Sequence, residues 1–384
     1  MGAYRIALFL LLPWLLVQFS KGRVKLGIID LMMIVTAAWF PISFTQNYDI
    51  SVGIEAGGAQ SVDMLLAYFI GRASLRNFGD LGKLLLVMAP GLFLAGFSVM
   101  VESIGGRLIV REIAQSIFGG ANEVGGELRY EYRSGLLRAY GPFSHPIHAG
   151  VYLTSFVPLF FVMFRKSSRK TFGIIIGALS FFALSSAGVL GLLLNLVLLG
   201  FDRVQREIKD IGWGMALSLL AALLLIVQIF SKSGVVSVIY RYLTFNPATG
   251  YFRTLIWEYA GADALRHPWF GIGYEAYLRP SWFGTTTTID AHYLAMAVKY
   301  GLLPALLFFA VGVSLVVMLA RRAIASPLSS QRSAFVGMAI CISIIIILLF
   351  TVTLWGSMFA WFCFLLGMFF SLARNPQNYN SKYL

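Results

Sequence analysis

Long apolar stretches recur along almost the whole chain, and they constrain its fold more than any other feature. Hydrocarbon offers no hydrogen-bond partner to a peptide group, so segments that cross a membrane in succession must be helices. The chain is 58% hydrophobic and 12% charged, which excludes a soluble fold. We therefore predict an all-α integral membrane protein, a polytopic helical bundle of about 11 transmembrane helices (roughly 10 to 12).

The expected helices can be placed from the apolar runs. They lie near 5–20, 26–44, 61–71, 84–102, 146–164, 171–186, 188–201, 211–230, 293–319, 333–351 and 353–372. The first run lacks a small-residue cleavage site, so it is interpreted as a retained helix rather than a signal peptide. The stretch 171–201 exceeds one ordinary span, so two helices joined by a tight turn at Ser185-Ser-Ala-Gly188 are preferred to one long tilted helix.

Basic residues concentrate in alternate loops, and this pattern predicts the topology. By the positive-inside rule, such loops face the cytoplasm. The net charge of +13 then reflects membrane orientation, and no nucleic acid is expected as a partner. The residues concerned are Lys21, Arg23, Lys25, Arg72, Arg76, Lys83, Arg165, Lys166, Arg169, Lys170, Arg203, Arg206, Lys209, Arg321, Arg322, Arg332, Arg374 and Lys382.

This topology divides the chain into segments and puts two long loops on the outer face. Because every cytoplasmic connection is short, we expect any chemistry to be extracytoplasmic. The predicted segments are the N-terminal transmembrane helices 1–102, the first outer loop 103–145, the central transmembrane helices 146–230, the large outer loop 231–292, the C-terminal transmembrane helices 293–372 and the cytoplasmic tail 373–384.

Several common chemical motifs are missing from the sequence. It has no Gly-x4-Gly-Lys-Ser/Thr loop, no His-Glu-x-x-His and no Asp-x-Asp, so ATP-driven work, zinc hydrolysis and metal-held nucleotide donors are disfavoured. No metal or other cofactor is expected. Asp30, Asp63 and Lys299 stand near predicted helix ends, where snorkelling or capping explains them, and Cys341 and Cys363 are interpreted as small core residues.

The end of the first outer loop carries a candidate anion site. Arg138-Ala-Tyr-Gly-Pro-Phe-Ser-His145-Pro-Ile-His148 places one Arg and two His directly before a helix that Pro146 can begin. A helix N-terminus beside a guanidinium favours phosphate oxygens, through its free N–H groups and its dipole. The alternative is that Arg138 anchors at lipid headgroups and that the His residues cap or pack.

The second outer loop alternates positive groups with aromatic rings. Aromatic faces pack on sugar rings and Arg forks hold diphosphate, as a lipid-linked glycan would require. An interfacial aromatic belt with snorkelling Arg is the alternative. Together with the first loop, this gives the candidate substrate-binding residues Arg138, His145, Arg241, Arg266, Arg279, Trp257, Tyr274 and Tyr293.

His292 precedes the helix expected from residue 293, at the membrane edge. A single His is more often structural, but Asp290 is close enough in sequence to set its tautomer. We therefore predict His292 as a general base of pKa near ambient pH.

These residues resemble the bacterial O-antigen ligase and polysaccharide polymerase family. The likeness covers about residues 115–372 and rests on three segments. His292-Tyr-Leu-Ala-Met-Ala-Val-Lys-Tyr-Gly301 is similar to the family's His-x-x-Leu helix start. Arg253-Thr-Leu-Ile-Trp257, followed by His267-Pro-Trp-Phe-Gly-Ile-Gly273, resembles its Arg-x3-Trp and Pro-x-x-Gly-x-Gly segments. Arg138 to Gly150 is similar to an Arg-x-x-Gly-x-Phe-x-His-Pro stretch of the exopolysaccharide members.

The resemblance implies a fold and a reaction. It implies a GT-C type glycosyltransferase in the bacterial inner membrane, with a large periplasmic loop and the active site facing the periplasm. The donor would be an undecaprenyl-diphosphate-linked oligosaccharide and the acceptor a glycan or lipid, with inversion and without a metal. Arg253 would hold the diphosphate and His292 would activate the acceptor hydroxyl. Chain-length regulators or export proteins would be further partners.

The sequence departs from the family at one place. Many members carry Ser-Arg-Gly between the two central helices, whereas this turn reads Ser185-Ser-Ala-Gly188. One phosphate contact is therefore missing, and Arg138, Arg241 or Arg279 is predicted to replace it. We expect a polymerase of exopolysaccharide or O-antigen repeat units, with an O-antigen ligase acting on lipid A core as the alternative. A lipid-linked glycan transporter or flippase is a second alternative.

Overall fold

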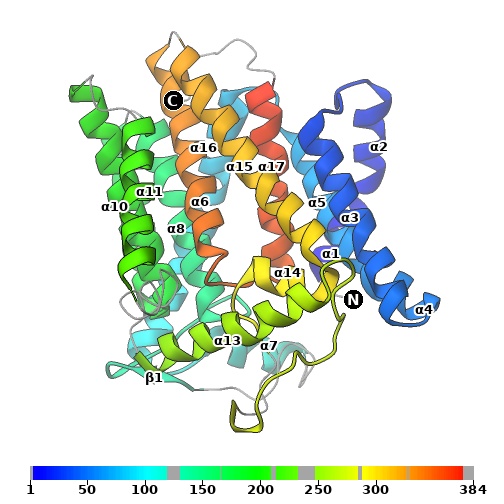
Figure 1. The fold of residues 1–384 in the computed structure, drawn as a ribbon. Coiled ribbons are helices and arrows are strands. Elements are labelled where there is room, and N and C mark those ends of the chain that lie inside the picture. The colour runs from blue at the N-terminus through cyan, green and yellow to red at the C-terminus, as the bar shows by residue number, and fades with distance from the viewer. Residues whose placement is uncertain are drawn as a thin grey trace.

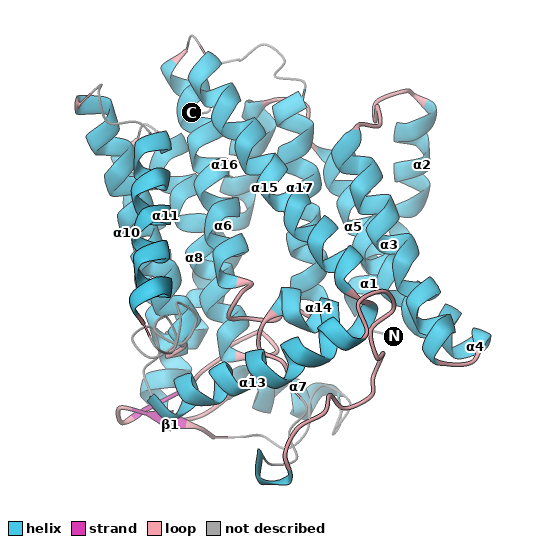
Figure 2. Ribbon diagram, in the orientation of Figure 1, coloured by secondary structure: helices cyan, strands magenta, loops and turns pink. Residues whose placement is uncertain are grey.

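The structure is a computed structural model that describes residues 3–118, 130–164, 166–208, 213–231, 247–283, 288–326 and 328–374. Helices make up nearly all of this part of the chain (Figure 2). The one sheet in these ranges is a hairpin of β1 (Tyr132–Arg133) and β2 (Leu136–Leu137). Its two turn residues, Ser134 and Gly135, have φ of 53° and 81°, as a tight hairpin turn requires. The predicted all-α class is confirmed.

Eight helical segments among the described residues are long and apolar enough to cross a membrane. The first, Ala3–Ser20, consists of α1 (Ala3–Leu10) and α2 (Leu12–Ser20). The others are α3 (Ile28–Asn47), α6 (Phe78–Gly105), α8 (Pro146–Met163), α10 (Ser186–Glu207), α15 (Leu302–Ala325), α16 (Ser329–Leu348) and α17 (Ser357–Arg374). The chain is therefore an all-α membrane protein.

Helices also occupy the remaining three predicted places, as α5 (Gly58–Ser74), α9 (Ser167–Ser180) and α11 (Trp213–Phe230). The predicted division of 171–201 into two helices is confirmed, but the predicted turn at Ser185-Ser-Ala-Gly188 is misplaced, because Ser186 already begins α10. A 3-10 turn, η3 (Phe181–Ala183), and Leu184 at φ 45° separate α9 from α10. Beyond this break, Gly188 meets Gly150 of α8 so closely that a Cβ on Gly150 would lie 2.8 Å from the Gly188 Cα. Small residues of this kind allow membrane helices to pack closely.

The predicted continuous helix 293–319 is wrong. The structure has α14 (His292–Tyr300) and α15, separated at Gly301, whose φ of 95° is incompatible with a helix. A Cβ at Gly301 would lie 2.0 Å from the Trp269 carbonyl oxygen, and the Leu302 amide donates to Pro268. The break is thus imposed by a chain segment about thirty residues earlier, which local periodicity does not reveal.

The outer-loop segments gather at one end of the bundle (Figure 1). These are α7 (Ile109–Phe118), the β hairpin, α13 (Pro247–Arg266) and α14. Two shorter helical elements, α4 (Ile50–Val52) and the π-helix η1 (Gly53–Gly57), link α3 to α5, and η4 (Ser281–Phe283) follows α13. The C-terminal end of α17 lies at the opposite end, as does the basic connection between α2 and α3. We call these the loop end and the basic end of the bundle.

A buried ion pair joins three helices near the basic end. Asp30 of α3 accepts from the Arg72 Nε at 2.7 Å and from the Tyr68 hydroxyl at 2.8 Å, and both donors lie on α5. The side chain of Asp30 is 0% exposed and that of Arg72 is 4% exposed. Asp30 also accepts from the Gly27 amide, and Arg374 of α17 lies 3.9 Å away. The predicted capping role of Asp30 is confirmed, and the carboxylate also ties α3 to α5 and α17.

We predict that Arg72→Met destabilises the fold by about 3 kcal/mol, because it leaves the Asp30 carboxylate buried without its principal counter-charge. Thermal unfolding in detergent measures the effect. Arg76→Met is the matched control, since Arg76 is exposed and lies just beyond the end of α5. Equal midpoints for the two variants would contradict the assigned role of the pair.

Candidate functional site

The predicted helix start at Pro146 is confirmed, and His145 is its N-cap. The His145 backbone is extended, and its Nδ1 accepts from the Ile147 amide at 3.2 Å. Burial, together with the positive charges of Arg138 and Arg111, lowers the pKa of His145 to about 3. His145 is therefore a neutral imidazole at ambient pH, and it both caps α8 and faces the candidate site.

His148 connects α8 to the segment between α16 and α17. Its ring nitrogens contact the Ser144 hydroxyl at 2.9 Å and the Thr353 carbonyl oxygen at 3.2 Å, and its ring packs on Trp355 at 3.9 Å between centroids. His148 is fully buried, so its role here is structural. It fixes the start of α8 against residues 352–355, which line the cavity described below.

The first loop contributes three arginines around the α8 start. Arg138 pairs with Glu131 and is largely buried. Arg111 donates to the Ser144 carbonyl at 3.0 Å and lies over the Tyr140 ring at 4.5 Å. The third, Arg133, donates to the Leu184 carbonyl at 2.8 Å.

Glu102, at the end of α6, holds this loop in place. Its carboxylate accepts from the Val110 amide at 2.8 Å and from the Gly141 amide at 2.9 Å. The carboxylate is buried, so these two N–H groups replace its water. Both arms of the first loop are therefore anchored to the end of one spanning helix.

Arg253 brings the second loop to the same place. It lies on α13, is 9% exposed, and its Nε is 3.7 Å from the Asp290 Oδ2. Burial lowers the pKa of Arg133, and the nearby charges of Arg138 and Arg253 lower it further. Guanidinium groups from both loops therefore act on one another. Like charges held together in this way favour an anionic ligand.

His292 is the first residue of α14, and its side chain is enclosed. Its amide donates to Leu349 at 2.8 Å, and its ring packs between Phe308 and Phe359 at 5.6 Å and 5.4 Å. Neither ring nitrogen has a partner among the described residues. The predicted pairing with Asp290 is wrong, because Asp290 instead pairs with Arg253. Burial lowers the pKa of His292 to about 3 rather than leaving it near ambient pH.

A cavity of about 590 Å³ opens between the two loops and the C-terminal helices. It is lined by His145, Tyr274, Asp290, Lys299 and Trp355, among others. Lys299 was interpreted as snorkelling, but its ammonium lies over the Tyr274 ring at 5.4 Å, and burial lowers its pKa. Asp290 therefore joins the cavity to Arg253, while His292 lies behind the lining.

The Gly-Ile-Gly segment forms one wall of this cavity because of its glycines. Gly271 and Gly273 have φ of 61° and 63°, and a Cβ on Gly273 would lie 2.4 Å from the Tyr48 ring. The Tyr48 hydroxyl accepts from the Tyr274 amide at 2.7 Å. Two amides of the segment, Ile272 and Gly273, donate to the last turn of α14. The predicted motif thus forms contacts with both α3 and α14 and holds the two helices together.

The structure does not bring every predicted binding residue into the cavity. Arg266 is half exposed and pairs with Asp263, and Arg279 lies over Tyr277. Tyr293 packs in the core against Phe309 and Phe350. Trp257 is half-buried on α13. The cavity lining does not include Arg138, Trp257, Arg266, Arg279 or Tyr293. Arg241 lies outside the described residues.

Four residues at the site were not predicted as binding residues: Arg111, Arg133, Lys299 and Trp355. Arg111 and Arg133 belong to the first loop, where their charge was visible in the sequence but their contacts with Ser144 and Leu184 were not. Comparison with models of protein families and with curated proteins finds no match for this chain.

We predict that His145→Asn weakens the pH dependence of stability. The folded pKa of about 3 lies below the ordinary value of 6.5, so the unfolded chain binds a proton that the folded chain does not. His145 thus contributes stability that is complete above pH 6.5 and is lost as the pH falls toward 3. Asn supplies a side-chain oxygen as N-cap acceptor in place of the His145 Nδ1, but it does not titrate. Between about pH 7 and about pH 5, the midpoint of thermal unfolding should fall less in the variant than in the unmodified protein. An identical fall in both proteins would contradict the assignment.

Proposed function

We propose that this chain is a membrane glycosyltransferase that takes glycan from an undecaprenyl-diphosphate-linked donor. The observation that carries the proposal is the Arg253 pair with Asp290, which lines a cavity at the end of a membrane bundle, together with the charges of Arg138 and Arg133, which act on the lining residue His145 and on Arg253. A diphosphate relieves the mutual repulsion of these charges, and the cavity accommodates sugar rings against Tyr274 and Trp355.

The finer architecture forms part of this proposal. About eleven spans and a large periplasmic loop, in a GT-C-like arrangement, agree with the helix at each predicted position. The bacterial inner membrane, with the loop end facing the periplasm, agrees with the basic connections at the opposite end. The donor's polyprenyl chain would then remain in the outer leaflet, with its diphosphate at the level of the cavity.

The missing arginine of the Ser-Arg-Gly turn has a replacement in this proposal. Arg133 donates to Leu184, directly before Ser185-Ser-Ala-Gly188, and so puts a guanidinium at the turn from another part of the chain. This position favours Arg133 over Arg138, Arg279 or Arg241 as the second diphosphate contact. Arg253 provides the first.

The reaction would be a single displacement. The acceptor oxygen forms a bond to the anomeric carbon as the bond from that carbon to the phosphate oxygen breaks, which inverts the centre and releases undecaprenyl diphosphate. Arg253 and Arg133 stabilise the charge that develops on the leaving oxygen. The acceptor proton passes to a base beside the cavity: Asp290 lines the cavity, and His292, without a hydrogen-bond partner among the described residues, lies behind the lining.

Polymerisation of exopolysaccharide or O-antigen repeat units is the preferred form of this reaction. Ligation of glycan to lipid A core would use the same groups. Transport of a lipid-linked glycan is a further alternative, and it requires charges along a path through the bundle. In the described spans, the buried acids Asp30 and Asp63 are instead held by Arg72 and Arg5, which favours a transferase.

We predict that Arg253→Ala and His292→Ala each reduce product formation at least about a hundredfold without changing membrane abundance. Product formation is measured as the chain length of the cell-surface glycan on gels. Arg266→Ala is the control, because Arg266 is also on α13 but forms an exposed pair with Asp263. Normal chains in the Arg253 or His292 variant would remove that residue from the mechanism. If Asp290→Asn reduces product formation more than His292→Ala does, Asp290 is the general base.

A deletion strain distinguishes the two transferase forms. Single repeats left on lipid carrier or core indicate a polymerase, whereas long unattached chains indicate a ligase. Unchanged glycans would contradict both.

A further inference from the structure

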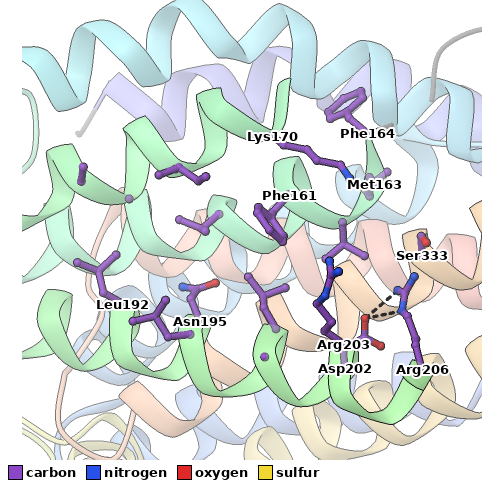
Figure 3. Close-up of a pocket in the computed structure, with 18 of the residues that line it drawn as sticks. Phe161, Met163, Phe164, Lys170, Leu192, Asn195, Asp202, Arg203, Arg206 and Ser333 are labelled. Carbon is purple, nitrogen blue, oxygen red and sulfur yellow. Dashed lines mark hydrogen bonds and ion pairs between the residues drawn. The ribbon is translucent and has the colours of Figure 1, made fainter. Parts of the chain in front are cut away.

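A second cavity, of about 820 Å³, lies at the basic end of the bundle, between α8, α9, α10 and the start of α16 (Figure 3). Its walls are mainly apolar and include Phe161, Ile174, Leu192 and Leu196. Ile174 is 55% exposed and Leu196 is 71% exposed. Because these side chains stand on helices of a membrane bundle, they face hydrocarbon. The cavity is therefore a groove that opens sideways to lipid.

One end of the groove is polar and positively charged. Figure 3 shows Lys170, Arg203, Arg206 and Ser333 gathered at this end, with Leu192 at the other. Two more hydroxyls, of Ser329 and Ser330, line it as well. Lys170, Arg203 and Arg206 lie at the ends of α9 and α10 that flank the basic connections, which the positive-inside rule assigns to the cytoplasmic side.

The ion pairs at this end leave positive charge available. Arg206 is engaged by Asp202 at 2.7 Å, and Arg203 pairs with Glu207 at 3.4 Å but is 82% exposed. Lys170 makes no ion pair or side-chain hydrogen bond with a described residue. The lining thus has three cations and one carboxylate, next to three hydroxyl donors.

We propose that this groove binds one anionic phospholipid of the leaflet at the basic end. Its phosphodiester lies against Lys170 and Arg203, the serine hydroxyls of α16 donate to its oxygens, and an acyl chain follows the wall formed by Phe161, Ile174 and Leu196. Charge selects an anionic headgroup over a zwitterionic one, and the apolar wall selects a lipid over free phosphate. The site lies at the opposite end from the donor cavity, so it does not rest on the proposed transferase function.

Native mass spectrometry of the purified full chain in mixed micelles of phosphatidylglycerol and phosphatidylethanolamine tests the headgroup contact. We expect preferential retention of phosphatidylglycerol. Lys170→Gln should weaken it about fivefold, the effect of one basic group near a membrane surface. Lys166→Gln is the matched control, because Lys166 is exposed on the same connection and does not line the groove. Equal losses in the two variants, or no preference for phosphatidylglycerol, would overturn the proposal.

A second pair of variants tests the acyl-chain groove independently of charge. Ala178 is exposed on α9 and lines the groove, so Ala178→Trp should fill it and reduce phosphatidylglycerol retention. Ile175→Trp places the same side chain on the same helix, outside the lining. It should leave retention unchanged. If both variants retain the lipid as the unmodified protein does, the lipid does not occupy this groove and the proposal is wrong.

Discussion

Hydrocarbon cannot hydrogen-bond to a peptide group or solvate a charge, and the rest of this structure follows from that constraint. The spanning segments are helices that satisfy their own backbone. Buried acids within them, such as Asp30 and Asp63, are held by Arg72 and Arg5. The remaining charged groups lie at the two ends of the bundle. The helices fix the positions of these charged groups, and the loop end and the basic end each carry their own set.

At the loop end, the bundle brings together segments that are far apart in sequence. The Arg253 contact with Asp290, the His148 contact with Thr353 and the Tyr48 contact with Tyr274 each cross between elements. These contacts order the loops while leaving like charges close together. In the proposed function, a bound diphosphate would offset the repulsion between these charges. Functional sites commonly carry such repulsion, which the surrounding packing has to offset.

The sequence predicted the parts of the fold that depend on local pattern. Apolar runs identified a helix at each of the expected places, and Pro146 marked a helix start, because span length and proline stereochemistry are local properties. Contacts between distant segments were missed. The helix is broken at Gly301 because the Trp269 carbonyl group lies against it. Asp290 pairs with Arg253 and not, as predicted, with His292. Lys299 and Tyr293 are on the same short helix, yet the first lines the cavity and the second packs in the core. Periodicity within a helix does not determine which neighbour covers each face.

The central claim is that the arginines of the two loops hold one lipid-linked diphosphate beside an acceptor hydroxyl. The most direct test is to incubate the purified protein, reconstituted in lipid, with an undecaprenyl-diphosphate-linked oligosaccharide and to follow the lipid product by mass spectrometry. The account predicts release of undecaprenyl diphosphate together with a lengthened or transferred glycan. Recovery of the intact donor, with no measurable binding to the protein, would contradict it.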